Sequence, residues 1–442
     1  MTKFLKIIWP QLVLLLSILI FQLNFDLVGW SFLISAVSSG LMLGISSLRQ
    51  VNSLTIYALF AFIFLGVIPW LHYTADALMW LSSSLPSSTL FFVNFAVFIS
   101  NNLVVIFHFI GSRSGRRINA SHVNIRRPAL TKLALLLLSF TGFVLVLYIN
   151  SFNFILLFFR GIYGIERELA FDSSAARLLI GMVARLLPAF ALFFAVTEIK
   201  GSRIFKLSLF VLLLLSVFPT GVARFLVAFV YVPLILLLIP KMRSGVVFSG
   251  GLIFALLMVF PFLDQFRNYT TGSSIRLIPS EEFFFLQHFD AYENFASAVD
   301  ANFVSYGSQL FGSLLFFVPR SIWPDKPLGS GYVLAQELVY TWSNISMPFL
   351  GEGYVNFGFF GVFIFAAFLG FTLGNLDRKM AVRTKSENEF SYRTAVYFFL
   401  LSALFFLLRG DLLSSFAFLC AGFVVSKAVE IIVRFLNAKL AQ

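Results

Sequence analysis

Charged residues are scarce in this chain, and cysteine and histidine are scarcer still. Only 12% of its 442 residues are charged, against about 25% in soluble domains, so an ordinary soluble globular fold is excluded. The single cysteine, Cys420, excludes an intramolecular disulfide. The four histidines are scattered without the spacing of zinc ligands, so we expect no metal site; they are His72, His108, His122 and His288.

Apolar residues take the place of the missing charge. They make up 59% of the chain, and the mean hydropathy is +0.92, as in proteins that cross a membrane many times. A helix needs roughly 20 apolar residues to cross about 30 Å of hydrocarbon. We therefore predict an all-α polytopic membrane protein with about twelve spans, near residues 7–23, 28–47, 54–72, 89–110, 131–150, 178–198, 206–220, 223–240, 246–263, 353–375, 394–409 and 412–433. Pro219 and Gly221 predict a break, and a helical hairpin, between the seventh and eighth spans.

The basic residues lie mostly in short connections between these spans. If the N-terminus faces the cytoplasm, every dense basic cluster falls on the cytoplasmic side, and so does the C-terminus. The net charge of +12 therefore reflects membrane orientation rather than nucleic-acid binding. The first apolar stretch lacks a small-residue cleavage site, so we expect it to be a retained span.

Two longer segments, 151–177 and 264–352, lie on the opposite face. The second combines acidic and aromatic residues, which argues against a disordered linker. Within it, Ser308–Val318 is too short to span and predicts a re-entrant or interfacial helix. The chain thus divides into nine spans with basic cytoplasmic loops (1–263), an outward loop (264–352) and the C-terminal spans (353–442).

The stretch "LLFFVPRSIWPDKP" (314–327) places charged residues directly after an apolar run. Its three prolines remove N–H donors, so neither a helix nor a strand continues through it. Irregular backbone at membrane depth is tolerated only where protein or a water-filled cavity covers it. We expect this rigid segment to hold Arg320 and Lys326 at the mouth of a cavity, with Trp323 at the membrane interface or beneath a sugar ring.

Further ionisable residues lie in or beside the spans, where a lone charge costs several kcal/mol. Arg185 is inside a span, whereas Arg224, Glu352 and Arg409 are at the outward ends of theirs, and Arg267 begins the outward loop. A guanidinium offers a planar fork of donors suited to phosphate oxygens and keeps its charge. This pattern predicts a site for a lipid phosphate or pyrophosphate, next to carboxylates that suit general-base chemistry on a sugar hydroxyl. The alternative is a set of ion pairs that holds the outward loop against the helices.

Four motifs carry a resemblance to a known family. "VPRSIWPDKP" resembles the Pro-Arg-x-x-Trp-Pro-x-Lys-Pro signature of bacterial oligosaccharide repeat-unit polymerases, the Wzy-type O-antigen and capsule polymerases. "GEGYVNFGFFGV" (351–362) is similar to their Gly-Glu-x-Tyr-x-Asn-Phe-Gly motif, "RGDL" (409–412) to a C-terminal motif, and "TGVARF" to a mid-chain arginine motif. The order and spacing match over about residues 215 to 415, and the N-terminal half matches only in having many spans.

The resemblance implies a glycosyltransferase of the bacterial inner membrane with a GT-C-like fold. Such an enzyme joins undecaprenyl-pyrophosphate-linked oligosaccharides at the periplasmic face, transferring the growing chain en bloc to a new unit. It requires no nucleotide sugar, metal or other cofactor, and its candidate partners are a chain-length regulator and a flippase.

The resemblance also assigns roles to residues. The cations would bind the pyrophosphates and stabilise the leaving group; they are Arg224, Arg267, Arg320, Lys326 and Arg409. Trp323 and Tyr354 would contact substrate. The general base would be Glu352, at a helix start on the outer boundary, or Asp290 beside His288, and Asp411 would orient Arg409.

Two other functions remain open at this point. An O-antigen ligase shares topology and donor and tends to depend on a histidine in the outward loop, for which His288 is the one candidate here. A lipid-linked oligosaccharide flippase needs cations along the interior of two halves, whereas most of the cations here gather at the outer face and no two-half symmetry is visible.

Overall fold

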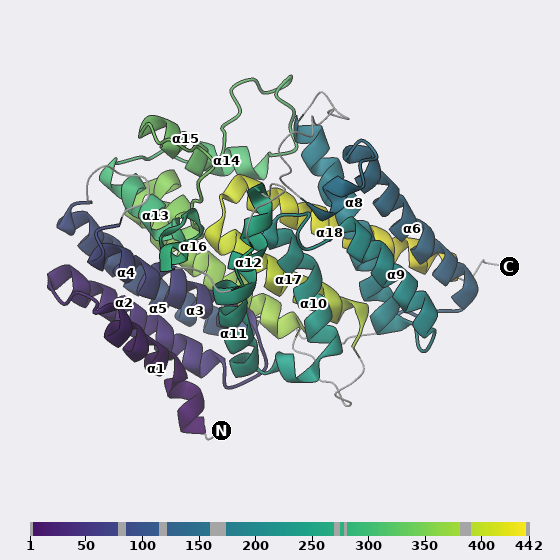
Figure 1. Ribbon diagram of the computed structural model, residues 1–442, viewed down its shortest axis with the longest axis horizontal. Coiled ribbons are helices and arrows are strands. Elements are labelled where there is room, and N and C mark those ends of the chain that lie inside the picture. The colour runs from purple at the N-terminus through teal and green to yellow at the C-terminus, as the bar shows by residue number, and fades with distance from the viewer. Residues whose placement is uncertain are drawn as a thin grey trace.

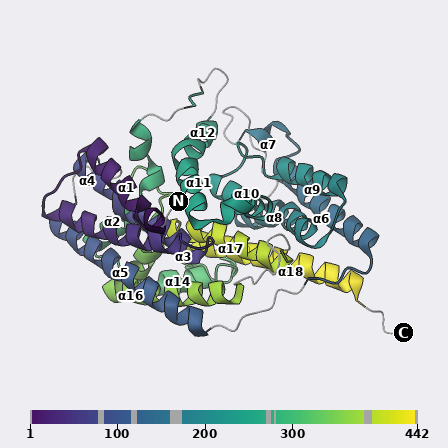
Figure 2. The same ribbon diagram turned by 90° about the horizontal axis from the view of Figure 1, so that it is seen from below.

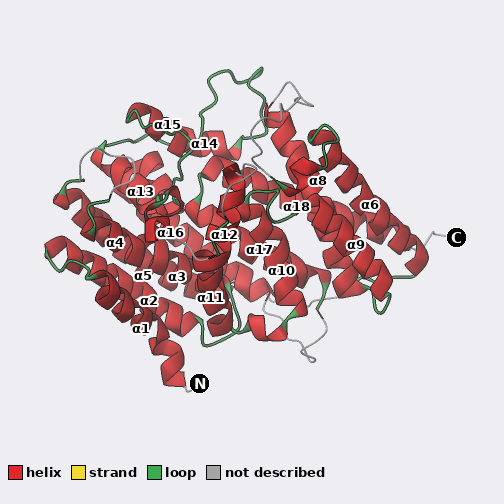
Figure 3. Ribbon diagram, in the orientation of Figure 1, coloured by secondary structure: helices red, strands yellow, loops and turns green. Residues whose placement is uncertain are grey.

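The computed structural model describes residues 3–77, 85–114, 122–159, 174–268, 275–277, 281–380 and 390–438, without the side chains of 174–179, 267, 268 and 281. Within these residues the chain is helical and has no β-strand, which confirms the all-α prediction (Figure 3). The α-helices are α1 (Lys3–Phe21), α2 (Leu27–Ser46), α3 (Ser53–Phe62), α4 (Ile68–Thr74), α5 (Ser87–Ser114), α6 (Pro128–Ile149), α7 (Ile155–Phe158), α8 (Ser174–Glu198), α9 (Arg203–Ser216), α10 (Arg224–Leu238), α11 (Gly245–Phe254), α12 (Phe260–Asp264), α13 (Ala291–Asp300), α14 (Ser308–Leu314), α15 (Ser330–Glu337), α16 (Phe349–Met380), α17 (Tyr392–Arg409) and α18 (Leu412–Asn437). Two π-helical turns, η1 (Ile63–Val67) and η3 (Ala255–Val259), and four 3₁₀ turns, η2 (Pro240–Arg243), η4 (Gln265–Asn268), η5 (Glu281–Phe285) and η6 (Gln287–Phe289), join them.

The helices form two groups with a central set between them (Figures 1 and 2). Helices α1 to α5 lie with α13 and α16 at one side, and α6, α8 and α9 lie at the other. Helices α10, α11, α12 and α17 stand between the groups, and α18 runs from the centre to pack on α8. The short helices α14 and α15 cap one end of the bundle, which we call the capped end.

Ten helical stretches in the described part of the chain are long and apolar enough to cross a membrane, which confirms a polytopic protein. The two spans missing from the predicted twelve are 206–220 and 223–240, which form α9 and α10, of 14 and 15 residues. At 1.5 Å per residue they extend about 21 and 22.5 Å, short of about 30 Å of hydrocarbon. Helix α9 packs mainly on α8 and α6, whereas α10 packs mainly on α17, so the break joins two parts of the bundle instead of forming a hairpin.

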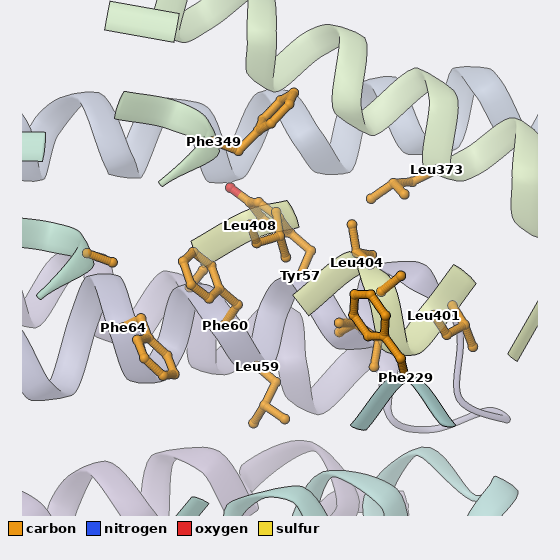
Figure 4. Packing of buried hydrophobic residues seen from close by; sticks show 14 of the residues in the cluster. Tyr57, Leu59, Phe60, Phe64, Phe229, Phe349, Leu373, Leu401, Leu404 and Leu408 are labelled. Atoms are coloured by element: carbon orange, nitrogen blue, oxygen red, sulfur yellow. The ribbon is translucent and has the colours of Figure 1, made fainter. Parts of the chain in front are cut away.

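Aromatic and branched aliphatic side chains fill the interior. Phe60 and Phe64 stack with their ring centroids 5.3 Å apart, and Phe405 of α17 packs edge-on against both. Figure 4 shows this part of the core, where Tyr57 and Phe60 of α3 lie beside Leu408 of α17. Many Phe and Leu side chains are also exposed on the outer faces of the helices, as expected where lipid rather than water surrounds a bundle.

Helix α16 is broken inside the glycine-rich motif that the sequence places at a span start. Phe357 and Gly358 leave helical geometry, with Gly358 at φ +63°, which L side chains rarely adopt. A Cβ on Gly361 would lie only 2.0 Å from the carbonyl oxygen of Gly353, eight residues earlier. The segment before the break therefore folds back on the helix that follows it, and the predicted span 353–375 is not one straight helix.

The described residues of the segment 264–352 contain several short helices. Helix α13 is buried and packs against α16 and α5, and α14 packs against α18. The segment Ser308–Val318, for which we predict a re-entrant or interfacial helix, contains the short helix α14, which ends at Leu314. These short elements hold the loop on the capped end of the bundle, where most of the predicted site residues lie.

Candidate functional site

One cavity of about 1290 Å³ extends into the bundle from the segment between α14 and α15. Among the described residues, its wall carries five basic side chains from α8, α10, α17 and the segment after α14; they are Arg185, Arg224, Arg320, Lys326 and Arg409. His288, Asp290 and Asp411 lie on the same wall. Seven predicted site residues, scattered over nearly 190 positions from Arg224 to Asp411, are therefore brought together.

Arg224 is part of a hydrogen-bonded group with a histidine and an aspartate. Its Nη2 lies 3.1 Å from Asp264 Oδ1 and donates to His288 Nδ1 at 2.9 Å. Because Nδ1 accepts this bond, the imidazole proton is on Nε2, which lies 2.9 Å from Asp264 Oδ2. The histidine is thus neutral, in agreement with its pKa, which burial and then the charges of Arg224 and Arg409 lower below the usual range.

Arg409, the last residue of α17, is fixed by the turn that carries His288. Its Nε donates to the carbonyl of His288 at 3.0 Å, and its Nη2 donates to Gln287 O and to Asp290 Oδ1, at 3.0 and 2.9 Å. Asp290 is buried and also accepts from the side chains of Asn294 and Ser346 and from the Ser346 N–H. Asp290 therefore orients Arg409, a role that the sequence had assigned to Asp411.

Arg320 and Lys326 bond to backbone carbonyls of their own rigid segment. Arg320 Nη1 donates to Pro324 O at 3.2 Å, and Lys326 Nζ donates to Phe316 O and Val318 O at 2.9 and 2.8 Å. Within the described residues neither contacts a carboxylate, so both charges lack a counter-ion there. Burial, and then the charge of Arg320, lower the pKa of Lys326. This direction is expected where two cations lie close together without a neighbouring anion.

Glu352 does not reach the cavity. Its side chain is only 1% exposed, and its two oxygens accept from Ser330 Oγ at 2.7 Å and from the Leu412 N–H at 2.8 Å. These bonds tie α16 to the starts of α15 and α18. Glu352 therefore has the geometry of a structural link between helices. We preferred Glu352 as the general base from the sequence, but its carboxylate does not line the cavity where a substrate would bind.

Asp411 caps α18 and contacts the cavity. Its Oδ1 accepts from the Ser414 N–H at 2.9 Å, the usual bond of an N-cap. Its Oδ2 lies so close to Gly329 that a Cβ at that glycine would be 1.8 Å away. Burial raises the pKa of the Asp411 carboxyl. A side chain at position 329 would therefore displace the Asp411 carboxylate from its place at the start of α18.

Three further predicted residues lie away from the cavity wall or beyond what is described. Trp323 is not part of the wall, and Tyr354 is buried between the rings of Phe295 and Phe359. Arg267 falls in η4, and its side chain lies outside the described residues. The tryptophan that does line the cavity is Trp342, with 42% of its side chain exposed.

Sequence reasoning missed Trp342 and the role of Asp264. Asp264 is the last residue of an apolar span and was counted only as one of many outward acids. Its position could have indicated this role, because Asp264 is a carboxylate at the end of one span and Arg224 is a cation at the end of another. Trp342 carries no comparable signal, because its neighbours "VYTWSNIS" form no recognisable motif.

Below the charged wall, the cavity continues between apolar side chains of α3, η1, α10, α11, η3 and α17. We call this part the apolar arm; its lining is Ile56, Phe64, Ala228, Phe229, Val232, Phe248, Leu252, Leu256, Leu401, Ser402 and Phe405. Phe260 O accepts from Arg224 Nη1, and Phe248 is twelve residues earlier on the same helical stretch. The arm therefore reaches about 18 Å below the arginine, at 1.5 Å per residue.

The described residues contain no group of three or more His, Cys, Asp or Glu side chains placed to share a metal ion. The groups on the charged wall instead offer anion binding by arginine and lysine, and one neutral imidazole held by an aspartate. Comparison with known protein families, with curated proteins and with solved structures gives no match.

Proposed function

We propose that this chain is a membrane glycosyltransferase that polymerises oligosaccharide repeat units carried on undecaprenyl pyrophosphate, at the periplasmic face of a bacterial inner membrane. The observation that carries the proposal is the gathering of Arg224, Arg320, Lys326 and Arg409 on one wall with His288. Their motifs resemble those of Wzy-type polymerases, and their side chains suit the one group common to both substrates, a pyrophosphate.

The four cations fall into two kinds with different tasks. Arg224 and Arg409 are already oriented by Asp264 and Asp290, so they lose little freedom when an anion binds. Arg320 and Lys326 have only backbone carbonyls as partners among the described residues, so a pyrophosphate gives them their counter-charge. Such preorganised donors stabilise the charge that develops on a departing pyrophosphate.

His288 is the best placed general base. Asp264 holds its Nε2–H, which leaves the Nδ1 lone pair directed at Arg224 on the cavity wall. When a pyrophosphate binds, Arg224 keeps its contact with Asp264 and exchanges only its hydrogen bond to Nδ1 for one to the anion, so Nδ1 is free to accept a proton. Asp290, by contrast, already accepts four hydrogen bonds, and Glu352 lies behind the wall.

The reaction is a displacement at the anomeric carbon of the growing chain. The acceptor sugar hydroxyl forms the new C–O bond as His288 Nδ1 takes its proton. The bond between the anomeric carbon and the pyrophosphate oxygen breaks, and the pyrophosphate on its lipid leaves with the electron pair. Arg224, Arg320, Lys326 and Arg409 hold that anion.

The direct test is incubation of the purified protein with a lipid-linked repeat unit and no nucleotide sugar. The proposal expects a ladder of longer products in the wild type and none in Arg409→Gln or Arg320→Gln. Asp325→Asn changes an exposed carboxylate in the same motif and is expected to keep the ladder. A wild-type protein that leaves the repeat unit unextended refutes the polymerase.

A ligase is the second candidate, because His288 of the outward loop lies on the cavity wall. The phenotype of a deletion strain distinguishes the candidates. Loss of a polymerase leaves single repeat units attached to their final acceptor, whereas loss of a ligase leaves polymer on the carrier lipid. Loss of a flippase leaves neither on the outside.

A further inference from the structure

The apolar arm has the shape and chemistry of a chain-binding site. Phe248, Leu252, Leu256 and Phe260 recur every four residues on the stretch from α11 to α12, which places them on one helix face toward the cavity. Phe229 of α10 and Leu401 of α17, both labelled in Figure 4, also line the arm. The arm is thus enclosed by four helical walls.

Nothing in the arm suits a polar ligand. Its one polar side chain, Ser402, donates its hydroxyl to the carbonyl of Phe399 at 2.7 Å and so has its partner already. Apolar walls around an empty space lose dispersion contacts, so an apolar occupant stabilises the arm. The occupant must be long and narrow, because the arm reaches about 18 Å down from the level of Arg224.

A single helix separates the arm from the exterior of the bundle. Val247, Phe254 and Met258, on the other side of α11 and η3, are 45%, 61% and 38% exposed. A membrane lipid thus needs to cross only one helical layer to place its chain inside. That layer contains the π-helical turn η3, whose wider backbone is a common feature of functional sites.

We propose that the arm binds the hydrocarbon chain of the lipid whose pyrophosphate is held by Arg224 and Arg409. The inference deepens the proposed function, because it takes the charged wall as the headgroup site. The cavity is continuous from these arginines to Phe248, so one amphiphile fills both parts. The protein then recognises the lipid chain itself and not only the phosphates.

The test compares two ligands with the same head, farnesyl pyrophosphate and inorganic pyrophosphate, on the full chain in nanodiscs of neutral lipid. Ala228→Phe on α10 and Leu252→Trp on α11 fill the arm from two of its helices. Val227→Phe is the matched control, because Val227 is next to Ala228 but not on the cavity wall. We expect both filling variants to lower the affinity for farnesyl pyrophosphate about tenfold or more and to change the affinity for inorganic pyrophosphate by no more than about twofold. The control variant is expected to keep the wild-type affinity for both ligands.

Three results overturn the arm as a chain site. They are unchanged affinity for farnesyl pyrophosphate in both filling variants, equal losses for the two ligands, and a wild type that binds the two ligands equally well. These results leave the polymerase open to its own test. Conversely, the filling variants can lose affinity for farnesyl pyrophosphate alone while the wild-type protein fails to extend lipid-linked oligosaccharide. That combination supports the lipid-chain site and refutes the polymerase.

Discussion

Asp290 and Arg409 show how much of the site depends on a single buried carboxylate. Replacing Asp290 by alanine leaves the guanidinium without its counter-ion and leaves Asn294 and Ser346 without their acceptor. Arg409 is 30% exposed and keeps its bonds to His288 O and Gln287 O, so the main cost is the loss of an acceptor for buried polar groups, about 1–3 kcal/mol, and the variant is expected to unfold at a lower temperature. Thermal unfolding in detergent measures this. Asp325→Ala, an exposed carboxylate, is the control and is expected to stay within about 0.5 kcal/mol of wild type; an equal loss in both contradicts the assignment.

The proposed role of His288 predicts how the rate of chain extension depends on pH. Its neutral form is the base, and burial lowers its pKa, so protonation begins only below the usual histidine range of about 6.5. The kcat/KM of chain extension is therefore expected to be flat near neutrality and to fall as the pH decreases through that lowered pKa. His288→Gln is expected to lose about 10²–10⁴-fold in rate together with this acid limb. If His288→Gln still shows the fall in kcat/KM at acidic pH, that fall is due to another group.

At this scale the sequence pointed to cations that share the cavity wall, but it gave no sign that Glu352 is buried away from that wall. Arg224, Arg320 and Arg409 are visible because a charge beside an apolar run needs a reason. Glu352 is equally visible, but its partners Ser330 and Leu412 are 22 and 60 residues away along the chain. Only the packed structure shows that both oxygens of this carboxylate already accept hydrogen bonds behind the cavity wall.

Among the elements, the reversal in α16 offers the sharpest test of structure. Gly361→Ala brings a methyl group to within 2.0 Å of the Gly353 carbonyl oxygen, so one of the two backbones must move. Overpacking of this kind costs about 1–3 kcal/mol. Gly250→Ala on α11 is the matched control, because nothing lies within 4 Å of its added Cβ and alanine favours a helix by about 1 kcal/mol. Unfolding temperatures that rank the variants in the opposite order contradict the fold-back.

Element existence could be read from hydropathy, whereas element endings could not. The apolar run 206–220 looks like a span, yet α9 stops at Ser216. The run at 353–375 looks continuous, yet Gly358 turns the chain back on itself. Hydropathy records which residues avoid water, and it contains no information about which of several glycines takes a left-handed φ.

For the whole molecule, the shortness of α9 and α10 leaves the alternation of the chain unchanged. In the described part of the chain we expect each of the ten long helices, and each helix of this short pair, to reverse the direction of the one before it, so both termini are expected on one side. The ends of α5 and α16 pack against each other, and Ser53 at the start of α3 bonds to Asp377 near the end of α16. The connection between α10 and α11 bonds to the one between α2 and α3. These neighbouring ends and connections carry basic residues, among them Arg113, Lys241 and Arg378, and they lie at the end of the bundle opposite α14 and α15. From the positive-inside rule we expect that end to face the cytoplasm and the charged wall to face the outside.

This orientation can be measured because Cys420 is the one native cysteine. In a Cys420→Ser background, Ser321→Cys places a thiol in the exposed segment after α14, and Ser114→Cys places one at the exposed end of α5. A membrane-impermeant maleimide added to spheroplasts is expected to label the first variant and to label the second only after the membrane is opened. The reverse pattern puts the cations on the cytoplasmic side, where the lipid-linked acceptor is not displayed, and so refutes the periplasmic polymerase. Equal labelling of both thiols in sealed spheroplasts means that the two positions share one side, which contradicts the alternation of the helices.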